Sequence, residues 1–272
     1  MMLPPSTLSD EEFRLLRQLF HSEIGLHLSS SKKSLVSGRL IKRLGMLGLP
    51  SFKDYYNLLM APEQNEERQR AIDLITTNET YFFREHKHFD FLRQQILPTV
   101  DHSHTLKVWS AASSTGEEAY SVAMLLEATR AHLPWAVFGS DISSRVLTAA
   151  RRGLYPMARG DRIPKDYLKR FCLKGLGQYE GQFLVQQELR KKVEFRQLNL
   201  MGLPSSLGLF DVVFLRNVII YFDLPTKARV VRGVAEHLRP GGWLFVGHSE
   251  SLHGMDSGLE LVMPSIYRKR AP

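Results

Sequence analysis

The sequence predicts an α/β protein, with a parallel sheet covered by helices on both faces, preceded by a smaller all-helical unit. From about residue 106, short apolar runs alternate with helical stretches, which is typical of such a sheet. Residues 1–75 carry apolar side chains only at helical spacing. A glycine-containing segment over 155–189 is too long for a crossover loop and includes a short β-like run, so it predicts a small inserted β-subdomain.

The helical unit is expected to hold four helices. Ser9 and Glu12 have the spacing of a capping box, which places the start of the first helix. Gly25 is placed to end that helix, because glycine readily adopts the left-handed conformation of a helix end. The other helices are expected over about 31–47, from near residue 51, and over 66–75. No catalytic motif is present in this unit.

A connecting segment, 76–98, leads to an α/β unit over 99–272. Strands are expected over 106–111, 136–141, 193–197, 211–215 and 243–246, and helices over 117–130, 143–152 and 225–238. In sheets of this type ligands bind beyond the carboxyl ends of the strands, where the strand order reverses. We therefore expect functional residues directly after the strands.

The composition is that of a soluble globular protein, with 43% hydrophobic and 24% charged residues, which argues against disorder and fibrous repeats. The single cysteine, Cys172, cannot form an internal disulfide or a thiolate zinc cluster, so a reducing compartment is expected. No apolar run is long enough to span a bilayer, and the first residues lack a secretory signal pattern. These features predict a cytoplasmic protein without membrane insertion.

The formal net charge is +8, from 36 basic and 28 acidic residues. Such an excess favours an anionic partner, which could be nucleic acid, an acidic protein surface or an anionic membrane face. It is also common in enzymes for which it has no specific role. Charge alone does not choose among these alternatives.

The turn after the first strand is rich in small residues and leads into Glu117 and Glu118. Two carboxylates at the start of a helix would repel a phosphate but suit hydroxyl groups or a cation, although they could merely complement the helix dipole. Asp141 ends the second strand, where such folds hold a ribose, or it could cap the next helix, a role that Ser143 could also fill. Together these residues suggest a positively charged adenosine ligand without pyrophosphate, which describes S-adenosylmethionine.

Other motifs argue against alternative chemistries. The run from Gly247 to Ser251 resembles a nucleophile elbow but lacks its second glycine. The histidine pairs 86/88 and 102/104 lack the spacing of a helical metal site, so no metal is expected. Cys172 lies in the insertion, away from any strand end, which disfavours a cysteine nucleophile. The segment after the fourth strand lacks the paired prolines of adenine methyltransferases.

Four segments, taken in order, closely resemble one known family. They are TTNETYFFR (76–84), WSAASSTGEE (109–118), RNVIIYF (216–222) and GHSE (247–250). They are similar to the CheR family of chemotaxis receptor glutamate O-methyltransferases, which use S-adenosylmethionine. The resemblance covers nearly the whole chain and implies a Rossmann-like class I methyltransferase domain, an all-α N-terminal domain and an inserted antiparallel β-subdomain. One departure is Ala119, where the family usually has proline.

The resemblance also implies site residues. The residues implied to hold the cofactor are Asn78, Thr80, Arg84, Glu118, Asp141, Asn199, Leu200, Asn217 and Val218. Arg84 and Tyr221 are implied to act at the substrate carboxylate and the transferred methyl group. From the residues alone, Arg84 could instead form a surface ion pair with Glu79 or Glu85, and Tyr221 could be a core aromatic.

The second helix provides a separate indication of an acidic partner. On a helical wheel a basic face forms beside the apolar one, made of Lys32, Arg39, Lys42 and Arg43. A face of this kind is often only solvated. A receptor bundle rich in glutamate would be a suitable target, and we expect these residues to dock the substrate.

The sequence therefore predicts an enzyme that methylates glutamate side chains of chemoreceptors, with S-adenosylhomocysteine as the second product. The expected partner is the acidic cytoplasmic helical bundle of the receptor, and not nucleic acid. The resemblance adds two candidates: a receptor tail peptide, which the inserted subdomain docks in those members of the family that need it, and a regulatory protein. Two alternatives are a nucleic-acid methyltransferase, which the net charge favours, and a catalytically silent module that only binds the cofactor.

Overall fold

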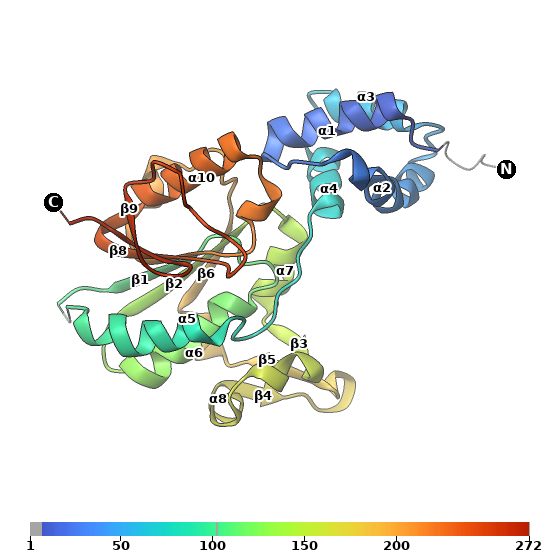
Figure 1. Cartoon of the computed structure of the whole chain (residues 1–272). Coiled ribbons are helices and arrows are strands. Elements are labelled where there is room, and N and C mark those ends of the chain that lie inside the picture. Colours follow the sequence, from blue (N-terminus) through green and yellow to red (C-terminus); the bar gives the residue numbers. More distant parts are fainter. Residues whose placement is uncertain (1–6, 102, 272) are drawn as a thin grey trace.

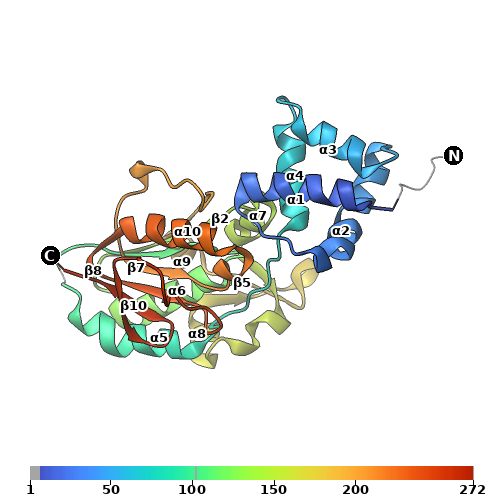
Figure 2. The same ribbon diagram turned by 45° about the horizontal axis from the view of Figure 1, so that its top comes forward.

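The computed structural model describes residues 7–101 and 103–271. Figures 1 and 2 show a helical unit at the N-terminal end, an α/β unit that forms most of the molecule, and a small sheet at the edge of that unit. This arrangement confirms the predicted fold class. None of the helices in the described part of the chain is both long enough and apolar enough to cross a membrane.

The helical unit packs four helices around its own buried core. They are α1 (Asp10–Ile24), α2 (Lys33–Leu47), α3 (Phe52–Met60) and α4 (Asn65–Ile75). The predicted capping box is present, because the Ser9 hydroxyl accepts from the Glu12 N–H while the Glu12 carboxylate accepts from the Ser9 N–H. Gly25 ends α1 with φ +73°, as the sequence predicts.

Residues 76–85, here called the strap, connect the two units without regular structure. The strap runs along the α/β unit and leads into α5 (His86–Phe91), which continues as a π-helical turn, Leu92–Ile96. The sequence pattern predicted no helix here. α5 and this turn bury Phe89, Leu92 and Ile96 in the same core as helix α6 (Glu117–Arg130).

In the described residues, seven strands form the main sheet in the order β6-β2-β1-β7-β8-β10-β9. The strands are β1 (Leu106–Ser110), β2 (Trp135–Asp141), β6 (Val193–Gln197), β7 (Phe210–Leu215), β8 (Leu238–Val246), β9 (Leu259–Met263) and β10 (Ile266–Lys269). β6, β2, β1, β7 and β8 are parallel, and β10 and β9 are antiparallel. Because β2 and β7 flank β1, the strand order reverses there and opens a crevice at the carboxyl ends.

Helices cover both faces of this sheet. They are α6 (Glu117–Arg130), α7 (Ser144–Arg152), α9 (Gln187–Arg190) and α10 (Leu224–Glu236). α5 and α6 share one core, and α10 packs into a second core on the opposite face. The predicted strands and helices agree with these bounds to within two residues, except that β8 begins at Leu238. The antiparallel edge formed by β9 and β10 was not predicted.

The inserted segment forms a separate sheet between α7 and β6. It contains β3 (Leu154–Pro156), α8 (Lys165–Phe171), β4 (Cys172–Lys174) and β5 (Gln182–Val185), with the antiparallel order β3-β5-β4. Only the β5 run was visible in the sequence, because strands of three residues carry too little alternation to be recognised. Figure 1 shows this subdomain (yellow) on the side of the sheet away from the N-terminal helices.

Candidate functional site

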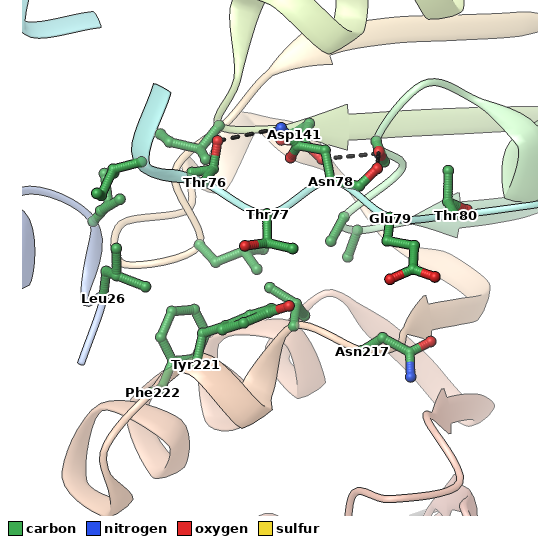
Figure 3. A pocket seen from close by; sticks show the side chains of 18 of the residues that line it. Leu26, Thr76, Thr77, Asn78, Glu79, Thr80, Asp141, Asn217, Tyr221 and Phe222 are labelled. Atoms are coloured by element: carbon green, nitrogen blue, oxygen red, sulfur yellow. Dashed lines mark hydrogen bonds between the residues drawn. The ribbon is translucent and has the colours of Figure 1, made fainter. Parts of the chain in front are cut away.

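A pocket of about 180 Å³, partly open to solvent, lies at the carboxyl ends of β1, β2 and β7. The strap crosses it, and the segment after α1 closes one end. Figure 3 shows the strap residues Thr76 to Thr80 between Asp141 on one side and Tyr221 with Phe222 on the other. Three separate parts of the sequence therefore form the walls of one pocket.

Asp141 ends β2 and is only 8% exposed. Its Oδ2 accepts from the N–H of Ser114 (2.8 Å), and its Oδ1 accepts from the N–H of Ser143 (3.0 Å). Ser143, and not Asp141, caps α7. Burial raises the pKa of Asp141, although these backbone donors oppose the effect. Because each carboxylate oxygen can accept more than one hydrogen bond, Asp141 can still receive ligand hydroxyl groups.

A chain of buried charges lies beside the pocket. The Arg216 side chain is 1% exposed, and its Nη1 lies 2.9 Å from Glu118 Oε2 and its Nη2 3.0 Å from Glu85 Oε2. The Ser110 hydroxyl donates to Glu118 at 2.7 Å. Burial raises the pKa of Glu118, although the charge of Arg216 opposes the shift. Burial also acts to raise the pKa of Glu85, but the interactions with Arg216 and His248 outweigh it, so this pKa is lowered.

The neighbouring carboxylate, Glu117, has a different role. It is fully buried and lies 2.6 Å from the guanidinium of Arg159 in the inserted subdomain. Glu118 lines the pocket and Glu117 does not. The two glutamates are adjacent in the sequence but have different roles: Glu118 lines the pocket, whereas Glu117 forms a structural ion pair.

The strap brings Asn78, Thr80 and Arg84 to the pocket. The carbonyl of Asn78 accepts from the hydroxyl of Ser114 at 2.9 Å, which fastens the strap to the turn after β1. Arg84 donates to the carbonyl of Glu79 at 3.1 Å and lies over the ring of Tyr81. Among the described residues Arg84 does not form the surface ion pair that was considered as an alternative.

Asn199, Leu200, Asn217, Val218 and Tyr221 also line the pocket. The side-chain amide of Asn199 donates to the carbonyl of Glu23 at 2.7 Å and so joins the pocket wall to the helical unit. Tyr221 is only partly buried. It packs against the core of the helical unit, as a core aromatic would, but it also lines the pocket. All ten predicted cofactor and catalytic residues thus line one pocket.

Several residues that shape this site were not predicted from the sequence. Arg216 is the clearest, since its position directly after β7 could have indicated it. Two non-glycine residues of the pocket lining, Ser114 and Asn217, have positive φ, as do Phe83 and Glu85 on either side of Arg84 in the strap. Such conformations are uncommon and concentrate at functional sites. Of these four residues, only Asn217 is of a type that tolerates positive φ well, so only this one could have been suspected from the sequence.

The four residues of the predicted basic face have different surroundings in the structure. Lys32 and Arg39 line the mouth of the pocket, and Lys42 is exposed. Arg39 donates to the carbonyl of Ile75 and to the hydroxyl of Thr77. Arg43 forms an ion pair with the buried carboxylate of Glu67 from α4, so its guanidinium already has a partner within the helical unit.

One group of side chains in the described residues could ligate a metal ion. Glu85, His88 and His248 bring potential ligand atoms within 4.8 Å of one another. The Arg216 guanidinium already lies 3.0 Å from the same Glu85 carboxylate, so a metal ion would meet a fixed positive charge. Burial and Arg216 lower the pKa of His88 to about 3. This environment disfavours a second cation, and we assign no metal there.

Comparison with known proteins places the chain in a family. Residues 11–76 match the model for the CheR methyltransferase all-alpha domain, and residues 78–267 match that for the CheR methyltransferase SAM binding domain. The chain belongs to the CheR methyltransferase family. The matched CheR cofactor-binding domain begins within the strap and ends within β10, so it includes the other six strands of the main sheet described here.

Curated CheR relatives have similar lengths to this chain. The Escherichia coli (strain K12) chemotaxis protein methyltransferase is 40% identical over 96% of this chain and 91% of its own. Chemotaxis protein methyltransferase 2 of Pseudomonas aeruginosa is 41% identical over 89% and 86%, respectively. The protein from Borreliella burgdorferi is 39% identical over 96% and 94%. The chain is thus an S-adenosylmethionine-dependent methyltransferase of the CheR type.

The CheR pocket suits this cofactor. The carboxylate of Asp141, at the tip of β2, can accept hydroxyl hydrogen bonds, and that of Glu118 faces the same space. Apolar side chains of Ile142, Leu198 and Leu200 provide surfaces for a base. The residues present therefore fit a cationic adenosine ligand.

Proposed function

We propose that this enzyme transfers the methyl group of S-adenosylmethionine to glutamate side-chain carboxylates on the cytoplasmic domains of chemoreceptors. The products are glutamate methyl esters and S-adenosylhomocysteine, and the reaction takes place in the cytoplasm. The observation that carries the proposal is the uneven distribution of acidic and basic side chains around one pocket. Asp141 and Glu118 lie at its sheet side, together with Arg216, whose charge is paired with Glu85 and Glu118. Lys32, Arg39 and Arg84 line the side formed by the helical unit and the strap, with the carboxylate of Glu79 among them. This arrangement suits a cationic cofactor inside and an anionic substrate outside.

We assign the cofactor contacts as follows. Asp141 accepts hydrogen bonds from the ribose, Asn199 and Leu200 flank the adenine, and Asn217 and Val218 lie along the methionine portion. Glu118 attracts the cationic part of the cofactor, and the strap residues Asn78 and Thr80 cover it. The fit is supported by the position of each residue in the pocket lining.

The reaction requires alignment more than acid–base chemistry. A glutamate carboxylate has a reference pKa of about 4.3 and is already ionised at pH 7, so no general base is needed. The bound cofactor supplies an electrophilic methyl group, which the substrate carboxylate attacks while the carbon–sulfur bonding electrons remain on sulfur. Holding reactants in position can lower a barrier by roughly 7–11 kcal/mol.

Arg84 is the proposed holder of the substrate carboxylate. A guanidinium can donate two parallel hydrogen bonds to a carboxylate. Its contacts in the described residues are the Glu79 carbonyl and the Tyr81 ring, and these leave further N–H groups for a substrate. The hold must stay moderate, because the carboxylate loses charge on the way to the transition state. Tyr221 is proposed to shape the surroundings of the methyl group.

Substrate recognition is proposed to use surfaces outside the pocket. Residues 1–75 recognise the acidic receptor bundle through the cations Lys32, Arg39 and Lys42. Residues 76–98 contribute to the active site, and 99–272 form the methyltransferase domain. The inserted subdomain, 155–189, is the proposed dock for a receptor tail peptide, and a regulatory protein is a further expected partner.

The proposal is tested by methyl transfer from labelled S-adenosylmethionine to a purified receptor cytoplasmic fragment, with duplex DNA as an alternative acceptor. We expect base-labile label on the receptor, lost in Arg84→Ala. Arg268→Ala is a matched control, because Arg268, on β10, also lies over an aromatic ring (Trp243, 5.0 Å from the ring centroid) and also donates to a backbone carbonyl, that of Gly241. Label on DNA would support a nucleic-acid methyltransferase, and tight cofactor binding without any transfer would support a silent module.

A further inference from the structure

The turn Gly247–Glu250 follows β8 and was not given a role by the sequence. The side chain of Glu250 turns inward and the residue is only 5% exposed. Its carboxylate accepts three backbone N–H groups: those of Asn217 (2.7 Å) and Gly247 (2.6 Å) on Oε2, and that of Ile220 (3.2 Å) on Oε1. Two of these three donors belong to the segment Asn217–Phe222, here called the catalytic loop.

We propose that Glu250 is a positioning residue for methyl transfer and acts by fixing the backbone of the catalytic loop. The loop follows β7 and supplies Asn217, Val218, Tyr221 and Phe222 to the pocket lining. Asn217 has φ +57°, a conformation that needs support from its surroundings. The Glu250 carboxylate provides that support at the first residue of the loop.

The other end of the loop is held by the helical unit. The N–H of His27 donates to the carbonyl of Tyr221 at 2.8 Å, and Leu26 forms an isolated β-bridge with Phe222. The loop is therefore fastened at Tyr221 and Phe222 by the N-terminal unit, and at Asn217 and Ile220 by Glu250. Without the Glu250 contacts, the end of the catalytic loop that begins at Asn217, directly after β7, would no longer be held in place.

Gly247 supplies an independent indication that this contact is built into the fold. A Cβ atom at this position would lie 2.6 Å from Asn217 Nδ2 and 2.8 Å from Glu250 Oε2. Both distances are too short for real contacts, so a side chain at 247 would displace the Glu250 carboxylate and the side-chain amide of Asn217. Glycine here permits the close approach that the three hydrogen bonds require.

A carboxylate is the side chain that this position needs. It has acceptor sites on both oxygens and no donor, so it can satisfy all three N–H groups. A glutamine of the same shape would direct its own N–H₂ group toward at least one of them. Glu250→Gln should therefore disturb the loop with little change in packing.

The inference rests on the proposed function, and its test compares Glu250→Gln, Gly247→Ala and wild type. Glu260→Gln is the matched control, because Glu260 lies on the exposed strand β9 and pairs only with Arg270 in the described residues. Receptor methylation gives kcat and KM, calorimetry gives the Kd of S-adenosylhomocysteine, and thermal unfolding gives Tm.

We expect Glu250→Gln to lower kcat about 10- to 100-fold, since small misplacements have effects of this size. The cofactor product should bind more weakly, and KM for the receptor and the folded fraction should stay near wild type. Gly247→Ala should reproduce this pattern. Wild-type kcat and Kd in folded Glu250→Gln, or a loss of activity that merely follows the unfolded fraction, would overturn the inference. If wild type methylates no receptor, the proposed function fails, and the Kd comparison still decides the role of Glu250.

Discussion

The two sides of the pocket are built differently. On the sheet side, Asp141, Glu118 and Arg216 are held by short hydrogen bonds or ion pairs to groups that are themselves buried. On the strap side, Thr77 and Glu79 are exposed, and Arg84 has a single hydrogen bond to a carbonyl. The charged side chains of the sheet side are therefore held in place before any ligand binds. On the strap side the backbone is fastened, at Asn78 and Thr80 for example, but the side chains have fewer partners.

This difference matches the two demands of the proposed reaction. A cofactor is the same molecule in every cycle, and a preformed site avoids the cost of ordering side chains on binding. A receptor carboxylate arrives on a large partner and is first attracted by charge. We therefore expect substitutions on the sheet side to affect stability and cofactor affinity, and substitutions near the mouth to affect KM.

The largest effect is expected for Arg216→Met. This change leaves the carboxylates of Glu85 and Glu118 without their cation, and breaking a buried ion pair costs about 3–5 kcal/mol. The loss, measured by urea unfolding at pH 7, should shrink at lower pH because the carboxyl groups then become protonated. Arg268→Met, at an exposed arginine over Trp243, is the control. Equal stability of the two variants would show that the charge chain is not essential to the fold.

Asp141→Asn should have the next largest effect, on cofactor affinity. Hydrogen bonds to a charged group contribute about 1.5–3 kcal/mol, so the Kd of S-adenosylhomocysteine should rise roughly 10- to 100-fold. Asp211→Asn is a close control, because Asp211 also accepts a backbone N–H, from Lys107 at 2.8 Å, but at the amino end of the strands. Similar losses in both variants would mean that Asp141 acts on the fold and not on the ligand.

The sheet side was also the more predictable from sequence. Strands β1, β2 and β7 are short, largely apolar runs, and the residues that follow them must meet at one edge of a parallel sheet. Asp141 and Glu118 could thus be placed by local pattern and topology. β9 and β10 were missed because their residues alternate weakly and their pairing is antiparallel at the exposed edge.

Contacts that join distant segments could not be predicted in the same way. The helical wheel placed Arg43 beside Lys42 but could not show that Glu67, 24 residues later, lies against it. Likewise, no local pattern shows that Glu250 reaches the backbone of Asn217. Such pairs depend on how helices and loops pack, which a single sequence does not specify.

The Arg43–Glu67 pair gives a smaller, pH-dependent effect. Burial acts to raise the pKa of Glu67, but hydrogen bonds from Arg43 and Tyr55 outweigh it and lower the pKa below its ordinary value of 4.5. A lowered pKa contributes stability that is present above pH 4.5 and is lost as the pH falls through the folded value. Glu67→Gln, which keeps an acceptor but removes the charge, should cost about 1–2 kcal/mol at pH 7.

The measurement is the difference in free energy of unfolding between wild type and Glu67→Gln across pH. The difference should be constant from pH 7 to about pH 5.5 and should shrink below pH 4.5, where Glu67 itself loses its charge. A difference that does not change with pH would show that the contribution of Glu67 is packing and not charge.

The smallest effect is expected at Lys42, which is exposed on the same helix. Because it faces solvent, Lys42→Glu should leave Tm unchanged but raise KM for an acidic receptor fragment about 3- to 10-fold at low salt, and the effect should disappear as salt screens the charges. Lys107→Glu, an exposed change on β1 away from the pocket, controls for net charge. Arg43→Glu is unsuitable for this test, because it would also leave Glu67 without a partner. An equal rise in KM for Lys42→Glu and Lys107→Glu would mean that the receptor responds to overall charge, and not to this helix.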